Sequence, residues 1–411
     1  MLSINYQSLF QYKNFYNFLP LLICPFYVWG PFALELLFLL ILFISVIKFS
    51  SDYIDFYYNF KKIIFLFLIF YFLLIVSSLQ SNFFQETILN SFFYFRFLLY
   101  FLASSFIIIQ NKLEKKLSLS IFLTCSVLIF DGLYQYFTDY NIIGLGHLPG
   151  RITSFFVDEY RYGSFIQIFT PLSLSYFILE KKQKSNNIIL LFLILALCAT
   201  YVSGERKPFI LSFINTLFII SVIFNKKKKF LLLFFLIATI SLGLASLKNI
   251  NTFKKTFSYT ISQIYDGEKF YFFSKRHTGH YKAAINIFSE NLLIGAGPKS
   301  FRYECKKFEK KIEYACSTHP HNFYLQSLSE IGFFGFIFTL SIFFIVTFSL
   351  YKLYFKTNRI NDIESVRLII IFSLFLNLFP LMPSGNMFNN YLSMSFVIVL
   401  INLYIFSKLK N

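Results

Sequence analysis

The chain consists mainly of long apolar segments separated by short polar ones. An apolar run of about 20 residues is long enough to cross the hydrocarbon core of a bilayer as a helix, and by this measure the sequence predicts about twelve spans. They cover residues 13–29, 32–49, 62–80, 91–110, 117–137, 162–180, 187–203, 208–225, 229–247, 322–351, 365–383 and 387–408. We therefore expect an all-α polytopic membrane protein.

One polar segment, residues 248–321, is much longer than the others. It divides the chain into a first membrane part, 1–247, the long loop itself, and a second membrane part, 322–411. Apolar residues at helical spacing predict a helix over 279–289, and a second short helix is expected over 299–312. We expect this long loop to pack against the membrane part as a cap.

Composition and charge agree with a membrane protein. Of the 411 residues, 56% are hydrophobic and 61 are phenylalanine, more than a soluble domain could bury. A net charge of +18 on a soluble protein would suggest nucleic acid, but here the lysines and arginines cluster in alternate short loops. Because cytoplasmic loops carry the excess of positive charge, both termini are expected in the cytoplasm and the long loop outside. We expect membrane lipids, not nucleic acid, as partners.

The cysteines fall into two groups. Cys24, Cys125 and Cys198 lie within predicted spans and are expected to pack there. Cys305 and Cys316 lie in the long loop. They could form a disulfide in an oxidising compartment or remain free thiols.

All five histidines lie outside the predicted spans, and four of them belong to the long loop. The sharpest feature is His319-Pro-His321-Asn322, directly before an apolar segment. A histidine near the membrane surface can act as a general base at neutral pH, or it can be an idle residue that caps a helix. A metal site with His277 and His280 as further ligands is less favoured, because no known zinc-ligand spacing occurs.

Arg206 lies in a short turn, 204–207, between two predicted spans. A guanidinium held at the membrane boundary can bind a phosphate group through two hydrogen bonds, or it can reach the phosphates of surrounding lipids. Other arginines outside the spans could complete a pyrophosphate clamp, although each taken alone could be a solvated charge: Arg151, Arg161, Arg276 and Arg302.

Pro208 and Pro320 are expected at first helical positions, where the missing N–H has no partner to lose. Both helix N-termini would face outward and favour anions. Within the spans, Glu330 is expected to be a buried structural partner. Gly332 and Gly335 are expected to allow close helix approach.

Four stretches together resemble the O-antigen ligase family, which also contains O-antigen polymerases. They are 151–165, Ser203-Gly-Glu-Arg-Lys-Pro-Phe209, 281–302 and His319-Pro-His-Asn-Phe-Tyr-Leu-Gln-Ser-Leu-Ser-Glu-Ile-Gly-Phe-Phe-Gly335. The last of these is the most specific, and the twelve-span plan with a large late outer loop fits the remainder of the chain.

The resemblance implies a GT-C-like enzyme that carries out metal-independent, inverting glycosyl transfer without a cofactor, at the periplasmic face of the bacterial inner membrane. The donor would be a glycan on polyprenyl pyrophosphate. The acceptor would be the lipid A–core oligosaccharide in a ligase, or another lipid-linked glycan in a polymerase. His321 would deprotonate the acceptor hydroxyl, with His319 as its helper. Arg206 would bind the pyrophosphate, and Arg276 would be the loop arginine of the clamp. Arg302 and Arg151 are further candidates for the clamp because they lie outside the predicted spans.

A ligase-like glycosyltransferase is therefore the favoured hypothesis, and a polymerase is the next. A transporter or flippase of lipid-linked sugars usually has two related halves, and the sequence shows no such symmetry. A non-catalytic partner of an assembly complex would predict that His321→Ala leaves the surface glycan unchanged.

Overall fold

The computed structural model describes residues 16–48, 53–148, 150–157, 159–180, 185–224, 228–248, 254, 258–265, 270, 272–356 and 361–409. Within these ranges the chain is almost entirely helical and contains no strand, only isolated bridges. Seven of the helical segments described are long and apolar enough to cross a membrane, and shorter apolar helices accompany them. The predicted all-α polytopic membrane fold is confirmed.

Within the described residues, which leave out positions 13–15, 49 and 225 of the predicted spans, each predicted span overlaps one helix or two consecutive helices. In chain order they are η2 (Tyr16–Leu22) with α2 (Ile23–Trp29), α3 (Pro31–Lys48), α4 (Tyr53–Leu79), α5 (Phe84–Tyr94) with α6 (Arg96–Gln110), α7 (Glu114–Thr138), α8 (Tyr162–Ser173) with α9 (Ser175–Glu180), α10 (Ser185–Val202), α11 (Arg206–Ile223), α12 (Lys228–Lys248), α17 (Phe323–Lys356), α18 (Asp362–Asn377) and α19 (Asn390–Lys408). The sidedness of their connections stays a prediction.

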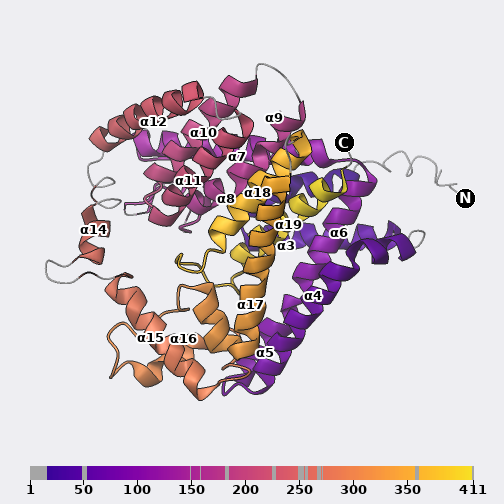
Figure 1. The fold of residues 1–411 in the computed structure, drawn as a ribbon, viewed down its shortest axis with the longest axis vertical. Coiled ribbons are helices and arrows are strands. Elements are labelled where there is room, and N and C mark those ends of the chain that lie inside the picture. Colours follow the sequence, from indigo (N-terminus) through magenta and orange to yellow (C-terminus); the bar gives the residue numbers. More distant parts are fainter. Residues whose placement is uncertain are drawn as a thin grey trace, which may run out of the picture.

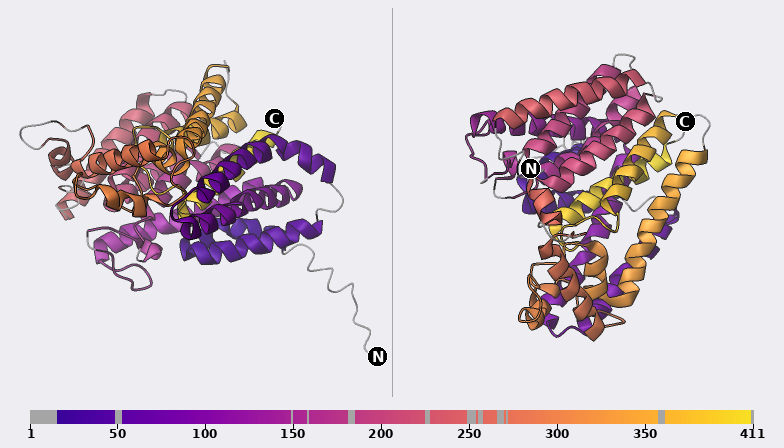
Figure 2. Two further views of the ribbon diagram at one scale, coloured as in Figure 1. Left: turned by 90° about the horizontal axis from the view of Figure 1, so that it is seen from below. Right: turned by 60° about the vertical axis from the view of Figure 1, so that its left-hand side comes forward.

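The helices form a body with two distinct ends (Figure 1). Helices α10, α11 and α12 lie at one end, and the long loop beyond α14 (Tyr259–Ile264) lies at the other, beside α5 and the first turns of α17. Figure 2 shows the same separation from a second direction. The long loop thus packs against the helices at one end of the body.

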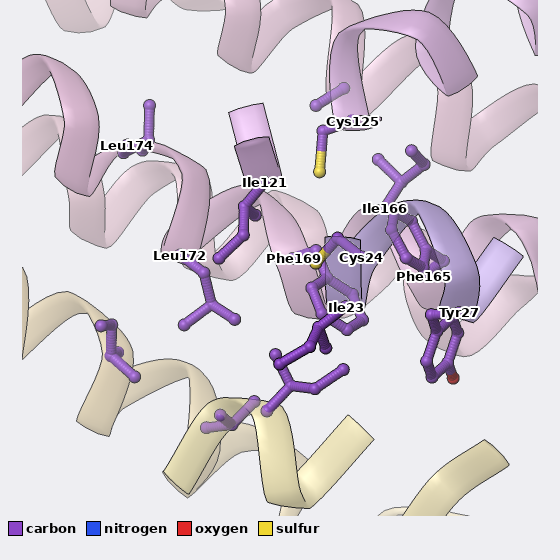
Figure 3. Close-up of a cluster of buried hydrophobic side chains, with 14 of the residues drawn as sticks. Ile23, Cys24, Tyr27, Ile121, Cys125, Phe165, Ile166, Phe169, Leu172 and Leu174 are labelled. Carbon is purple, nitrogen blue, oxygen red and sulfur yellow. The ribbon is translucent and has the colours of Figure 1, made fainter. Parts of the chain in front are cut away.

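The main hydrophobic core lies between the N-terminal helices and helices α6, α7, α8, α10 and α19. Figure 3 shows one part of it, where Cys24 and Tyr27 of α2, Cys125 of α7 and Phe165 of α8 lie together. These two cysteines and Cys198 are buried free thiols, as expected of packing residues.

Charged side chains within the helices have partners inside the protein. Arg96 forms an ion pair with Glu35, with 3.2 Å between Nη2 and Oε1. Asp131 is fully buried and accepts hydrogen bonds from the backbone N–H of Ile142, at 2.9 Å, and from the hydroxyl of Ser154. Pairing of this kind offsets the cost of placing a charge in an apolar surrounding.

The long loop contains the predicted helix and part of a second one. The helix expected over 279–289 is α15 (Lys275–Glu290), which begins earlier because the hydroxyl of Ser274 caps it by accepting from His277 N at 3.4 Å. The prediction of a helix over 299–312 is wrong in length. The helix α16 (Phe301–Glu304) continues as the 3-10 helix η6 (Cys305–Phe308), and helical structure ends at Phe308. The tighter turn brings the chain back toward α15.

A small core and a disulfide hold the loop together. Ala283, Ala284 and Ile287 of α15 pack against Phe301 and Cys305, all fully buried. Cys305 is bonded to Cys316, with 5.1 Å between their Cα atoms. The loop therefore has a hydrophobic core separate from that of the membrane helices.

Helix α17 is interrupted at Gly332, whose φ of 77° and ψ of −164° are not helical. The backbone of residues 292–297 docks at this break: Ala296 N donates to Ser329 O at 3.0 Å, and Phe333 N donates to Leu292 O at 2.9 Å. A Cβ on Gly332 would lie 2.5 Å from the backbone N of Gly295. An irregular backbone within a membrane helix is tolerated where protein satisfies its polar groups, as here.

Gly332 therefore admits a loop backbone, whereas the prediction was close approach of another helix. At Gly335 the neighbour is different again, because an added Cβ would meet the side chain of Ile331 on the same helix at 2.3 Å. Glu330, between the break and the helix start, is fully buried. Its carboxylate accepts from the backbone N–H of Phe301 at 3.1 Å and from Gln326 Nε2 at 2.9 Å, so it is a structural partner as expected.

Candidate functional site

The residue that caps α17 is Asn322. Its side-chain oxygen accepts from the backbone N–H groups of Tyr324, at 3.0 Å, and Leu325, at 3.1 Å. The expectation that Pro320 occupies the first helical position is wrong, because the side chain of Asn322 satisfies the free N–H groups two residues further on. His321 therefore precedes the cap and has a φ of 60°, in the left-handed region. Such strain in a residue other than glycine persists only where the surroundings hold it.

Two neighbours hold His321 in this conformation. Its carbonyl oxygen accepts from the backbone N–H of Ser384 at 2.8 Å, and its Nε2 lies 3.1 Å from the hydroxyl of Ser317. Ser384 belongs to the connection between α18 and α19, far away in sequence. The backbone of His321 is thus held by one segment and its imidazole by another.

Four histidines form one cluster. The ring of His321 lies 4.0 Å from that of His319 and 5.5 Å from those of both His277 and His280, measured between centroids. We call these four residues the histidine cluster. His147 is elsewhere, paired with Asp139 at the end of α7.

Hydrogen bonds fix the tautomers of two members. His319 Nε2 lies 3.3 Å from the carbonyl oxygen of Ser384, and His280 Nδ1 lies 3.5 Å from that of Ala315. Because a carbonyl oxygen only accepts, both nitrogens carry their hydrogen atoms. The Nδ1 of neutral His319 then accepts from the hydroxyl of Thr318 at 2.9 Å.

The cluster is electrostatically unfavourable for protonation. Burial lowers the pKa of all four imidazoles, to about 4 for His319 and about 3 for His321. The neighbouring histidines lower the pKa of His321 further. Among the described residues no carboxylate contacts the cluster to stabilise a charge. All four rings are therefore neutral near pH 7, and one ring nitrogen of His321 is unprotonated.

Three arginines lie within electrostatic reach of the cluster. Arg302 and Arg161 lower the pKa of His319, and Arg276 lowers that of His280. Arg302 Nε is buried and has no hydrogen-bond partner in the part of the chain that is described. Arg161 donates to the side-chain oxygen of Asn389 at 3.1 Å, at the start of α19. Arg161 was one of several outer arginines in the sequence, and only the fold brings it close to the cluster.

Arg206 and Arg151 form a second group. Arg206 Nη1 donates to the side-chain oxygen of Gln263 in α14 at 2.7 Å, and Arg151 lies over the ring of Tyr160, with 4.4 Å from Cζ to the centroid. The cationic side chain of Arg151 is close enough to act on Arg206. Among the described residues, this pair interacts with Gln263, with Tyr160 and with each other, so a single clamp with the arginines near the histidine cluster stays a prediction.

The turn that holds Arg206 is docked on α8. Glu205 accepts from the backbone N–H of Gly163 at 2.8 Å and from the hydroxyl of Ser164 at 2.7 Å. A Cβ on Gly163 would come within 2.4 Å of Ser203 Oγ, so only glycine permits this approach. Helix α11 begins at Arg206, which makes Pro208 its third residue instead of its first.

The segment 384–390 connects the cluster to the helix interior. Ser384 binds both His319 and the backbone of His321, while Asn386 accepts from Gln326 of α17 at 2.9 Å. Sequence reasoning missed this segment, because it carries no titratable residue and lies far from the histidines along the chain. Within the described residues, no group of three or more His, Cys, Asp or Glu side chains has the arrangement to hold a metal ion.

Comparison with known proteins is informative at the level of the family. The family model O-antigen ligase, Wzy_C, matches residues 191–340, a region that contains Arg206, Arg276, Arg302 and the whole histidine cluster. No curated protein matches the chain closely. The chain therefore contains an O-antigen ligase domain over residues 191–340, and this match supports a ligase- or polymerase-like membrane glycosyltransferase.

Proposed function

We propose that the protein transfers a glycan from a polyprenyl pyrophosphate donor to a hydroxyl of a lipid A–core acceptor, at the periplasmic face of the bacterial inner membrane. The observation that carries this proposal is the position of His321. It is a neutral imidazole held in a strained conformation, inside the matched domain, with arginines close by.

His321 acts as the general base. Its Nε2 accepts the proton of the acceptor hydroxyl while that oxygen forms a bond to the anomeric carbon of the donor sugar. The bond from this carbon to the phosphate oxygen breaks with its electron pair, and polyprenyl pyrophosphate leaves. Attack from the side opposite to the leaving group inverts the anomeric centre. General-base catalysis of this kind contributes about 10²–10⁴-fold.

The low pKa of His321 sets a requirement on the substrate. An imidazole with a pKa of about 3 is always in its base form near pH 7 but is a weak base. A bound diphosphate adds negative charge beside the cluster, which favours the imidazolium and raises the pKa. The donor therefore activates the base that its own reaction needs. Ser317, 3.1 Å from Nε2, orients the ring before the acceptor arrives.

Arginines stabilise the leaving group. We assign the diphosphate to Arg302 and Arg276, which act electrostatically on His319 and His280, with Arg161 as a third contact from the α8 side. Guanidinium groups aimed at developing charge lower the barrier in a site from which water is excluded. Arg206 and Arg151 bind the same donor from the α11 side, where α14 lies against Arg206.

Complementation tests this function. The chain is expressed in a strain that lacks its O-antigen ligase and in one that lacks its O-antigen polymerase, and the lipopolysaccharide ladder is scored. Restored long ladders on lipid A–core in the first strain, lost again with His321→Ala and kept with His147→Ala, are the expected result. Rescue of the polymerase-deficient strain alone would assign the chain as a polymerase. Movement of a labelled lipid-linked glycan across the membrane, without rescue, would assign it as a transporter.

A further inference from the structure

A polar cavity is lined by residues other than those of the histidine cluster. Its volume is about 240 Å³, and its lining includes Asn90, Arg96, Lys299 and Asn390. These residues come from α5, from the start of α6, from the turn before α16 and from the start of α19. Figure 1 shows α5 and α16 at the same end of the molecule.

The polar groups around this cavity offer positive charge. Lys299 Nζ donates to the side-chain oxygen of Asn90 at 2.7 Å, an uncharged partner. Arg96 donates to the side-chain oxygen of Asn390 at 2.9 Å and to Glu35 at 3.2 Å. Its Nε is buried and has no partner in the described part of the chain. The carboxylate of Glu35 offsets the charge of Arg96, whereas the positive charge of Lys299 has no such partner among these contacts.

Other nearby charges do not remove this excess. Burial lowers the pKa of Lys299, and Arg302 and Arg96 lower it further, whereas the carboxylate of Glu330 acts in the opposite direction. That carboxylate is already used by Phe301 N and Gln326. An anion in the cavity would therefore lie between two cations that repel each other.

The surface around the cavity is apolar. Leu89 and Phe93 line it and are 60% and 53% exposed, and their neighbour Phe92 is 61% exposed. All three lie in Phe84–Gln110, a segment apolar enough to cross a membrane. A ligand whose charged end enters the cavity would thus have its remainder against lipid-facing side chains.

We propose that this cavity binds the anionic, phosphate-bearing headgroup of a membrane lipid. Lys299 and the guanidinium of Arg96 contact the phosphate oxygens, the amides of Asn90 and Asn390 orient the two cations, and Leu89 with Phe93 contacts the acyl chains. The proposal does not rest on the transfer reaction assigned to His321.

Native mass spectrometry of the purified full-length protein tests it. The probes are short-chain phosphatidylglycerol, a diacylglycerol with the same chains, and inorganic phosphate as competitor. Phosphatidylglycerol is expected to bind saturably, and Lys299→Gln is expected to weaken that binding about tenfold, the effect of losing one hydrogen bond to a charged group. Lys299→Arg keeps the charge and should bind like the native protein. Lys311→Gln, the same change at an exposed lysine, is the matched control.

A second variant addresses the arginine. Arg96→Gln is combined with Glu35→Gln, so that no carboxylate is left unpaired, and weaker binding of phosphatidylglycerol is expected. The proposal is overturned if Lys299→Gln binds like Lys311→Gln, or if the diacylglycerol binds as well as phosphatidylglycerol. Displacement of the lipid by an equal concentration of inorganic phosphate would overturn the lipid as ligand and leave a site for free phosphate.

Discussion

Replacing Gly332 by alanine tests the docking of the long loop on α17. The φ of 77° and ψ of −164° at this position lie in a region that glycine alone adopts readily, so an alanine there costs about 1–3 kcal/mol. The new Cβ would also lie 2.5 Å from the backbone nitrogens of Gly295 and Ile294. Neither is a flexible side chain, so the turn must move away.

Moving that turn breaks the hydrogen bonds that hold it. Three hydrogen bonds between the turn and α17 have lengths of 2.9 to 3.0 Å: Ala296 N to Ser329 O, Gly297 N to Glu330 O and Phe333 N to Leu292 O. At about 0.5–1.5 kcal/mol each, their loss adds roughly 1.5–4.5 kcal/mol. The expected total for Gly332→Ala is therefore about 2.5–7.5 kcal/mol.

Gly144→Ala separates strain from docking. Gly144 has a similar φ of 83°, but an added Cβ would meet nothing within 4 Å. Its expected cost is about 1–2 kcal/mol, from backbone conformation alone. At roughly 2 °C per kcal/mol, apparent melting temperatures of the purified variants should fall by about 10 °C for Gly332→Ala and about 3 °C for Gly144→Ala. Equal shifts for both variants would refute the docking argument.

Three further predictions concern the site. Because the pKa of His321 is about 3, kcat/KM should stay unchanged as the pH is lowered well below 6.5, where an ordinary histidine becomes protonated. A fall in kcat/KM with a midpoint near pH 6.5 would contradict this. The free energy of unfolding should nevertheless fall below about pH 6.5, because the unfolded chain then binds protons that the native cluster does not. Reducing the Cys305–Cys316 disulfide, which closes a short loop, should lower the free energy of unfolding by about 2–3 kcal/mol. Dithiothreitol should therefore lower the melting temperature of the native protein but not that of a Cys305→Ala/Cys316→Ala variant. Arg302→Lys and Arg206→Lys should each reduce the transfer rate in a reconstituted assay, because lysine cannot bind a phosphate through two parallel hydrogen bonds, and full activity in either variant would exclude that arginine from the proposed clamp.

The sequence pointed to the site where residues able to carry out acid–base chemistry lie next to each other along the chain. The pair His319 and His321 lies in one short motif, and a loop of basic character precedes it. What the sequence did not show is that His277 and His280, on α15, close around His321 from the other side. Nor did it separate Arg302, beside the cluster, from Arg206, which contacts α14. Distances of this kind depend on how α15 packs on α17, and no local pattern encodes them.

The sequence by itself determined the class of the fold, because long apolar segments have one stable solution in a bilayer, a helix whose backbone hydrogen bonds are made internally. It also determined which segments carry titratable groups. Only the tertiary structure decided which of these groups lie close together in space. Gly295 and Gly332 meet because each lacks a side chain, and the loop backbone then enters a break in α17. That contact and the cap at Asn322 fix the two ends of the segment that surrounds His321.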